Sequence, residues 1–287
     1  MQFNSQNPLA KHFRQPKIYL TLPSGGNWYD GGLNMTETGE LPVFSMTARD
    51  ELRYKTPDAL LNGHATVEVI ESCIPNITNA WAIPNIDLDA ILVAIRIATY
   101  GEKLELTTTI PVVNEERTYI ADLRVMLDSL LSQKFENIVE FEDFKAEIRP
   151  LNYKYSNEIS MKTFEEQRIF YLLNKQQMDD ADKLTQIQNS FDTLTNMTIE
   201  LVKRSIVAIK YKDDDPVTNP EFINEFIDNA EKGFYYNIVK HIESQREKFS
   251  IKPMVAPVSP DDIEAGAPET VTIPILFDQS SFFANGS

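Results

Sequence analysis

The 287-residue chain has few of the residues that reactive and metal sites commonly use. It contains one cysteine, Cys73, and three histidines, His12, His64 and His241, which lie far apart in the sequence. A single cysteine excludes an internal disulfide framework and is typical of a protein in a reducing compartment. A zinc site needs about four Cys, His or carboxylate ligands. No such pattern occurs here, so we predict no metal-binding residues.

Long apolar segments are also missing. The longest strongly apolar run, residues 90–98, contains Arg96, whereas a helix that spans a bilayer needs roughly 20 apolar residues. The first 15 residues are polar and lack the hydrophobic segment of a signal peptide. We therefore expect no contact with a membrane.

Basic residues are scarce. The chain has 27 Lys and Arg against 43 Asp and Glu, which gives a formal net charge of −16. Its longest basic run is the pair Lys203 and Arg204. Phosphate backbones repel such a surface, so we expect no nucleic-acid partner.

Motifs of the common enzyme classes are absent as well. Gly25 and Gly26 are adjacent, but residues 27–32 supply neither the lysine nor the Ser or Thr that a phosphate-binding loop requires. There is no serine nucleophile elbow and no dinucleotide-binding glycine motif. A nucleophile pair of Cys73 and His64 would need an activating context that the sequence does not show. We predict no catalytic residue, no cofactor site and no enzymatic activity.

The remaining candidates for chemistry have structural explanations. We interpret Cys73 as a small buried hydrophobic residue. Asp87 and Asp89 flank the expected start of a helix, so we predict that one of them caps that helix and that the two do not form a paired-carboxylate site.

The densest structural signals lie in residues 43–100. Thr47 is a predicted N-cap, with acidic residues in the following turn. The segment 56–58, with proline at the first helical position, predicts a second helix. A third helix begins near residues 86–89 and ends before Gly101. Residues 91–97 are apolar on almost every side apart from Arg96, which predicts a buried central helix.

Alternation and helical periodicity predict the other elements. We expect strands at 17–22 and 41–44, a hairpin from 103–109 to a strand that begins at 118–120, β structure within 136–155, and helices over 123–131, 161–174, 183–210 and 219–248. The fold class predicted is α+β: short strands and a hairpin in an N-terminal mixed domain, a helical C-terminal half and a C-terminal edge strand. The predicted domains are a flexible arm (1–16), a core domain (17–160), a helical region (161–250), a linker (251–269) and a strand with a tail (270–287).

The helical pattern over 183–210 has a heptad-like seam. Its positions recur at steps of three and four, namely Leu184, Ile187, Phe191, Leu194, Thr198 and Leu201. This seam either packs onto the protein's own core or forms a docking face for a partner helix.

Two alternatives also remain for the C-terminal segment. Residues 251–269 are rich in proline and small residues and predict an extended linker. Residues 271–277 then alternate as a strand, in which Pro274 favours an edge position. The strand and the aromatic residues around it either fold back onto the body or add to the sheet edge of a partner. The candidate partner-binding residues are Leu184, Ile187, Phe191, Leu194, Phe277, Phe282 and Phe283.

Several of these stretches together resemble the baseplate hub subunit and hub assembly proteins of T4-like contractile-tailed phages. The matching blocks are residues 22–26 with Tyr29, 46–51, 56–63, 72–75, 83–89, 95–101, 122–124, 277–278 and 282–283. The resemblance covers residues 17–131 well and the last fifteen or so residues loosely. It is carried by the order and spacing of the blocks.

The chain departs from the family in one place. Many members carry a cysteine pair of the CPxC kind in the hairpin after the Tyr-Gly pair, where this chain has Ile110, Pro111, Val112 and Val113. A structural metal knuckle is therefore not expected here, and the hairpin must be held by side-chain packing.

The resemblance implies a non-enzymatic phage protein required to build the baseplate hub. Its expected partners are the hub or tape-measure proteins. The acidic surface, the heptad-like seam and the C-terminal tail favour a transient assembly chaperone in the host cytoplasm. The alternative is a permanent structural subunit of the tail baseplate in the virion.

Overall fold

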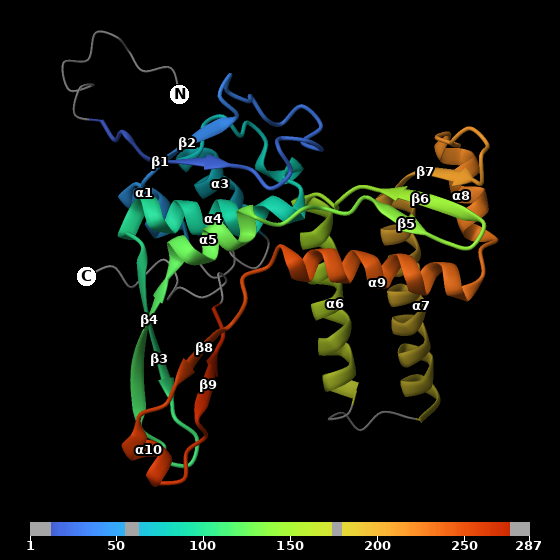
Figure 1. The fold of residues 1–287 in the computed structure, drawn as a ribbon. Coiled ribbons are helices and arrows are strands. Elements are labelled where there is room, and N and C mark those ends of the chain that lie inside the picture. The colour runs from blue at the N-terminus through green and yellow to red at the C-terminus, as the bar shows by residue number, and fades with distance from the viewer. Residues whose placement is uncertain (1–12, 55–62, 174–179, 276–287) are drawn as a thin grey trace.

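The computed structural model describes residues 13–54, 63–173 and 180–275. Within these ranges, short antiparallel sheets alternate with helices (Figure 1), which confirms the predicted α+β class. The elements are, in chain order, β1 (Pro16–Thr21), β2 (Glu40–Phe44), α1 (Ala48–Tyr54), α3 (His64–Cys73), the 3-10 helix η2 (Ala80–Ala82), α4 (Asn85–Tyr100), β3 (Lys103–Thr109), β4 (Glu116–Asp122), α5 (Leu123–Leu131), β5 (Ile138–Glu140), β6 (Phe144–Ile148), α6 (Tyr153–Leu173), α7 (Asp180–Ser205), β7 (Ile206–Tyr211), α8 (Pro220–Asp228), α9 (Lys232–Lys248), β8 (Met254–Pro257), α10 (Pro260–Glu264) and β9 (Thr270–Ile273).

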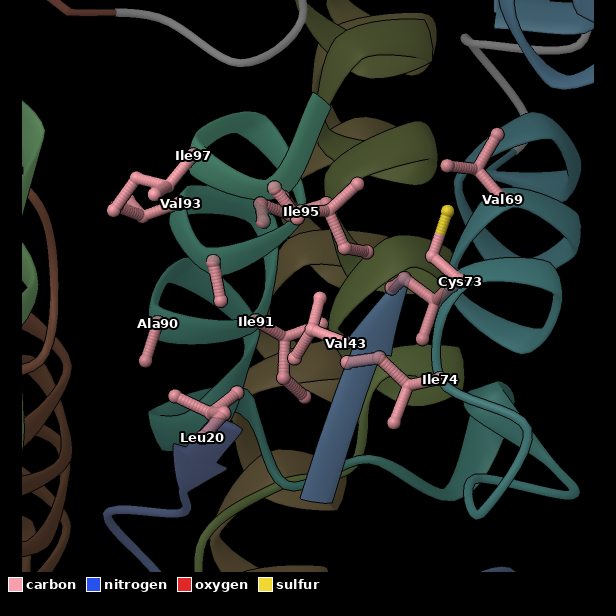
Figure 2. Packing of buried hydrophobic residues seen from close by; sticks show 14 of the residues in the cluster. Leu20, Val43, Val69, Cys73, Ile74, Ala90, Ile91, Val93, Ile95 and Ile97 are labelled. Carbon is pink, nitrogen blue, oxygen red and sulfur yellow. The ribbon is translucent and has the colours of Figure 1, made fainter. Parts of the chain in front are cut away.

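Helix α4 is the centre of the first apolar cluster, as its apolar sequence predicts. Its residues 90–98 are all buried, and the helix contacts β1, β2, α3 and α5. Figure 2 shows Ile91 and Ile95 directed toward Val43 of β2 and Cys73 of α3, whereas Val93 and Ile97 lie on the opposite side of the helix. The helix ends at Tyr100, and the C-cap residue Gly101 has a φ of 88°, which glycine readily adopts. Residues from both faces of α4 therefore join one core.

The predicted capping of this helix is wrong. Helix α4 begins at Asn85, so Asp87 lies inside the first turn and Pro84 occupies the N-cap. Neither Asp87 nor Asp89 caps the helix, because both carboxylates accept hydrogen bonds from distant parts of the chain. The Thr47 cap is confirmed, since its hydroxyl accepts from the Asp50 amide and Asp50 accepts from the Thr47 amide. The helix predicted at 56–58 lies outside the described residues.

The second apolar cluster surrounds a three-stranded sheet of order β5–β6–β7. Helices α8 and α9 and the end of α7 supply the rest of it. The predicted helix over 183–210 is therefore wrong after Ser205. Residues 206–211 instead pair with β6, with Ala146 opposite Ile209. The apolar residues 206–209 are compatible with either a helix or a strand, and pairing with the edge of β6 makes this segment a strand.

The third cluster holds the far end of the β3–β4 hairpin. The predicted linker 251–269 contains β8 and α10, so an extended linker is wrong for this segment. Strand β8 pairs antiparallel with β9, and their side chains pack with Ile110 at the hairpin turn. The expectation that this turn is held by side-chain packing is confirmed. We call β8, α10 and β9 the C-terminal clasp.

The C-terminal strand thus folds back on its own chain. Beyond β9, Ile275 is buried in the first cluster. Figure 1 shows the β3–β4 hairpin with the clasp beside it, and the α6–α7 pair projecting from the body at a separate place. The predicted domain boundaries stay predictions, because apolar clusters do not define independently folding units. No helix in the described part of the chain is long and apolar enough to cross a membrane.

Candidate interaction surface

The most buried polar group in the first cluster is the carboxylate of Asp87, which is 0% exposed. Oδ1 accepts from the Ser24 amide at 2.7 Å, and Oδ2 accepts from the hydroxyls of Ser24 and Tyr29. Burial raises the pKa of Asp87 to about 6, against the effect of these hydrogen bonds. Burial and the neighbouring carboxylate also raise the pKa of Tyr29. The group therefore anchors the loop 23–29 to α4 and offers no accessible nucleophile.

Asp89 has a different partner. Its Oδ2 accepts from the Ile251 amide at 2.9 Å, and burial raises its pKa to about 6. Asp87 and Asp89 therefore serve two separate contacts. The sequence analysis predicted that these two residues do not form a paired-carboxylate site, and their separate contacts agree with that prediction.

Cys73 is fully buried, in agreement with its interpretation as a small apolar residue. Burial raises the pKa of its thiol to about 12, so the reactive thiolate is disfavoured at neutral pH. The ring of His64 lies edge-on to Trp81 at 5.2 Å between centroids. Across the described residues, no group of three or more His, Cys, Asp and Glu could hold a metal ion. His12 lies outside them.

A cavity of about 700 Å³ borders Arg14, Asp50 and Ser72. The Arg14 guanidinium donates to the carbonyls of Ser45 and Ser72 and to the Ser72 hydroxyl. Residues 1–12 of the predicted flexible arm lie outside the described chain, but Arg14 is fixed to the first cluster. The cavity wall is thus a structural contact that joins the segment before β1 to α1 and α3.

The α6–α7 hairpin differs from the rest of the molecule in what it leaves exposed. The two helices project side by side from the body (Figure 1). Leu184 is 67% exposed and Phe191 58% exposed on α7, whereas Ile187 and Leu194 are half-buried. Phe164 of α6 is 56% exposed. The ring of Phe191 contacts Phe170 of α6 at 5.7 Å between centroids.

The α7 seam is therefore neither fully packed onto the protein's own core nor fully exposed as a docking face. The structure brings the seam residues together along α7, and part of the seam meets α6 while Leu184 and Phe191 stay largely accessible. The exposure of Phe164 was missed, because periodicity shows that a helix face is apolar and not whether another element covers it. Phe277, Phe282 and Phe283 lie outside the described residues.

A groove of about 340 Å³ separates the two helices near the body. Its walls include Tyr155 and Ile159 from α6 and Met197 from α7. The Arg204 guanidinium lies over the Tyr155 ring at 4.3 Å from its centroid. The charged side chains of Glu158, Lys162 and Glu200 also line this groove, so its surface is polar as much as apolar.

The chain matches a family model described as T4 bacteriophage base plate protein over residues 16–256. This chain belongs to that family. The match takes in the second apolar cluster, the whole α6–α7 hairpin and the first cluster apart from Ile275. No curated protein and no solved structure matches the chain.

Family membership places the protein at the phage tail baseplate, among structural and assembly proteins that contact other baseplate proteins. The resemblance to a T4-like baseplate protein found in the sequence is confirmed at this level.

Proposed function

We propose that the protein is a non-enzymatic tail morphogenesis protein required for assembly of the baseplate hub, and that it acts as a transient chaperone for hub or tape-measure proteins. The observation that carries the proposal is the α6–α7 hairpin, which presents Leu184 and Phe191 to solvent on a helix pair that projects from the body. Apolar surface of this kind in a baseplate protein is best explained by a protein partner.

The charge distribution supports a partner that is itself a protein. The chain carries a net charge of −16, which disfavours nucleic acid. Tape-measure proteins contain long helices, and an amphipathic helix can lie along an apolar helical surface. The proposed contact residues are the α7 seam (Leu184, Ile187, Phe191 and Leu194) together with the C-terminal aromatic residues Phe277, Phe282 and Phe283.

Co-expression with the hub and tape-measure proteins, followed by affinity capture, tests the proposal. We expect at least one of these proteins to be captured, and capture to fall when Phe282 and Phe283 are both replaced by Ser or when Leu184 is replaced by Glu. Phe222→Glu is the matched control, because Phe222 is 61% exposed on α8 and does not belong to the α7 seam. Recovery of neither partner would count against the assembly role.

A permanent structural subunit of the hub is the second candidate, and it is also compatible with membership of a base plate protein family. Mass spectrometry of purified tails separates the two. A chaperone is absent from mature tails or far below the copy number of the hub proteins, whereas a structural subunit is present in stoichiometric amount.

An enzymatic role would show differently. If the buried thiol of Cys73 had a catalytic role in tail assembly, Cys73→Ala would abolish assembly. We expect Cys73→Ala and added chelator to leave assembly unchanged, as measured by the yield of complete tails.

A further inference from the structure

The α6–α7 hairpin lacks an apolar core of its own. Among the described side chains of residues 153–172 and 183–201, only Ser190 is buried. Val202, near the end of α7, is buried, but it belongs to the second cluster in the body. Most of the stability of a helix in a protein comes from packing its apolar face. The hairpin therefore has apolar side chains available for a further contact along most of its length.

The hairpin is also nearly free of net charge. Helix α6 carries three acidic and three basic residues, and α7 carries four acidic and three basic residues. The two helices thus account for one of the 16 net negative charges of the chain. Residues 184–199 include a single charged residue, Asp192. Depletion of charge on an exposed, partly apolar surface is typical of the centre of a protein interface.

This distribution limits what can cover the hairpin. A basic partner would be drawn to the acidic body, and residues 184–199 offer it only Asp192. A partly apolar helix pair with almost no net charge is complementary to another surface of the same composition. A second copy of this chain provides such a surface, and its strongly acidic body would otherwise repel the first copy.

We propose that α6–α7 hairpins of two copies of this chain pack against each other, with Leu184 and Phe191 of α7 and Phe164 of α6 at the contact. The inference rests on the proposed function in one respect, since it names the occupant of the α7 seam. A hub or tape-measure protein that binds the same seam then competes with the second copy. Because the hairpins project from the bodies (Figure 1), an antiparallel arrangement about a two-fold axis joins the copies and keeps the two acidic bodies apart.

The hairpin is large enough for this contact. Helix α7 has 26 residues, and at about 1.5 Å per residue and about 10 Å width per helix the pair presents a face of roughly 600–800 Å². Specific interfaces bury about 800 Å² per partner. A contact along the full hairpin reaches this range, and a contact at its tip alone does not.

Sedimentation velocity of the full-length protein alone tests the proposal. We expect a concentration-dependent dimer that becomes tighter between about 50 mM and 500 mM salt, because salt screens the repulsion between the bodies. Leu184→Glu with Phe191→Glu weakens the dimer by roughly 30-fold or more, as expected for charges placed at the centre of an interface. Phe164→Glu tests the contribution of α6, and Phe222→Glu on α8 leaves the dimer unchanged.

Far-UV circular dichroism accompanies each variant. Leu184 and Phe191 are more than half exposed, so glutamate at these positions is compatible with a folded monomer. A variant that loses helix content is replaced by Leu184→Gln with Phe191→Gln, which removes the apolar contact without adding charge.

The possible results decide between the two proposals. If the wild-type protein stays monomeric at about 100 µM in high salt, the proposed contact between two copies is wrong. It is also wrong if the protein forms a dimer that the hairpin variants leave intact. Capture of a hub protein by a monomeric chain leaves the proposed function standing while this inference fails. A hairpin-dependent dimer that captures no hub or tape-measure protein supports this inference while the proposed function fails.

Discussion

The hydroxyl of Tyr29 lies 2.9 Å from Oδ2 of Asp87, although 58 positions separate these residues in the chain. Ser24 adds two more donors to the same carboxylate. Since all three residues are buried, water does not compete for these contacts. The loop after β1 is therefore attached to the central helix through one side chain.

The first prediction concerns this attachment. Asp87→Ala leaves the Ser24 amide and the hydroxyls of Ser24 and Tyr29 without their acceptor. Each buried, unsatisfied group costs about 1–3 kcal/mol, partly offset by removal of the buried charge, so we expect a loss of about 2–4 kcal/mol in the free energy of unfolding. Urea denaturation measures it. Asp213→Ala, in an exposed loop, is the control and should change stability by less than about 0.5 kcal/mol.

The second prediction concerns pH. Burial raises the pKa of both Asp87 and Asp89 to about 6, above the ordinary value of about 3.9. Between about pH 4 and pH 6 the folded state then holds more protons than the unfolded state, so these two groups make stability fall as the pH rises through this window. Their stabilising contribution is present at lower pH and is lost above about pH 6.

Asp89→Asn isolates one of the two groups. The side-chain oxygen of asparagine can still accept from the Ile251 amide, but the residue no longer titrates. Between pH 4 and 6, we expect the unfolding free energy of this variant to fall less steeply with rising pH. The decrease in slope should be at most the contribution of about one titrating proton. An unchanged slope would show that Asp89 titrates normally. Asp213→Asn, in the exposed loop, serves as the reference.

The third prediction concerns the core around α4. Ile95 is 0% exposed and points toward Val43 and Cys73 (Figure 2). Ile95→Ala removes buried methylene and methyl groups and leaves a cavity, for which we expect a loss of about 3–4 kcal/mol by urea denaturation. Leu52→Ala is the comparison, because Leu52 is 70% exposed. Equal effects of the two substitutions would contradict the central role of α4.

The fourth prediction concerns the C-terminal clasp. The guanidinium of Arg117 donates from Nε and from Nη2 to the two carboxylate oxygens of Asp262, at 3.0 and 2.9 Å. This pairing lowers the pKa of Asp262. Arg117→Ala leaves the largely buried carboxylate of Asp262 with only Ser259 as a side-chain donor.

Hydrogen exchange measures the result. We expect amides of residues 254–273 to exchange several-fold faster in Arg117→Ala, while those of α4 are unaffected, because the clasp opens locally. Arg117→Lys should restore little, since an ammonium group cannot pair with both oxygens as the guanidinium does. Arg124→Ala, which removes an exposed pair with Asp128 on α5, controls for loss of a surface charge.

Elements with strong local signals were predictable from the sequence. Helix α5 occupies the predicted residues 123–131, and β3 occupies the predicted residues 103–109. The apolar run 91–97 was enough to identify the buried helix. In each case neighbouring residues carry the whole signal, either as periodicity or as alternation.

Elements defined by distant contacts were not predictable. Asp87 was predicted as a possible helix cap from its position alone. Its partners Ser24 and Tyr29 lie 63 and 58 residues away, so no local pattern indicates them. The proline-rich segment 251–269 forms a strand and a short helix because the β3–β4 hairpin supplies the apolar contact at Ile110 and the charge at Arg117. For the interaction surface, the α7 seam was visible in the sequence, whereas its exposure depends on what the rest of the chain leaves uncovered.

The position of Ile275 has a consequence for how the chain is made. This residue is buried in the same cluster as Leu20 of the first strand. During translation the amino-terminal core therefore lacks one of its members until residue 275 has left the ribosome. Nascent chains that stop before residue 275 would expose apolar surface to the cellular quality-control machinery.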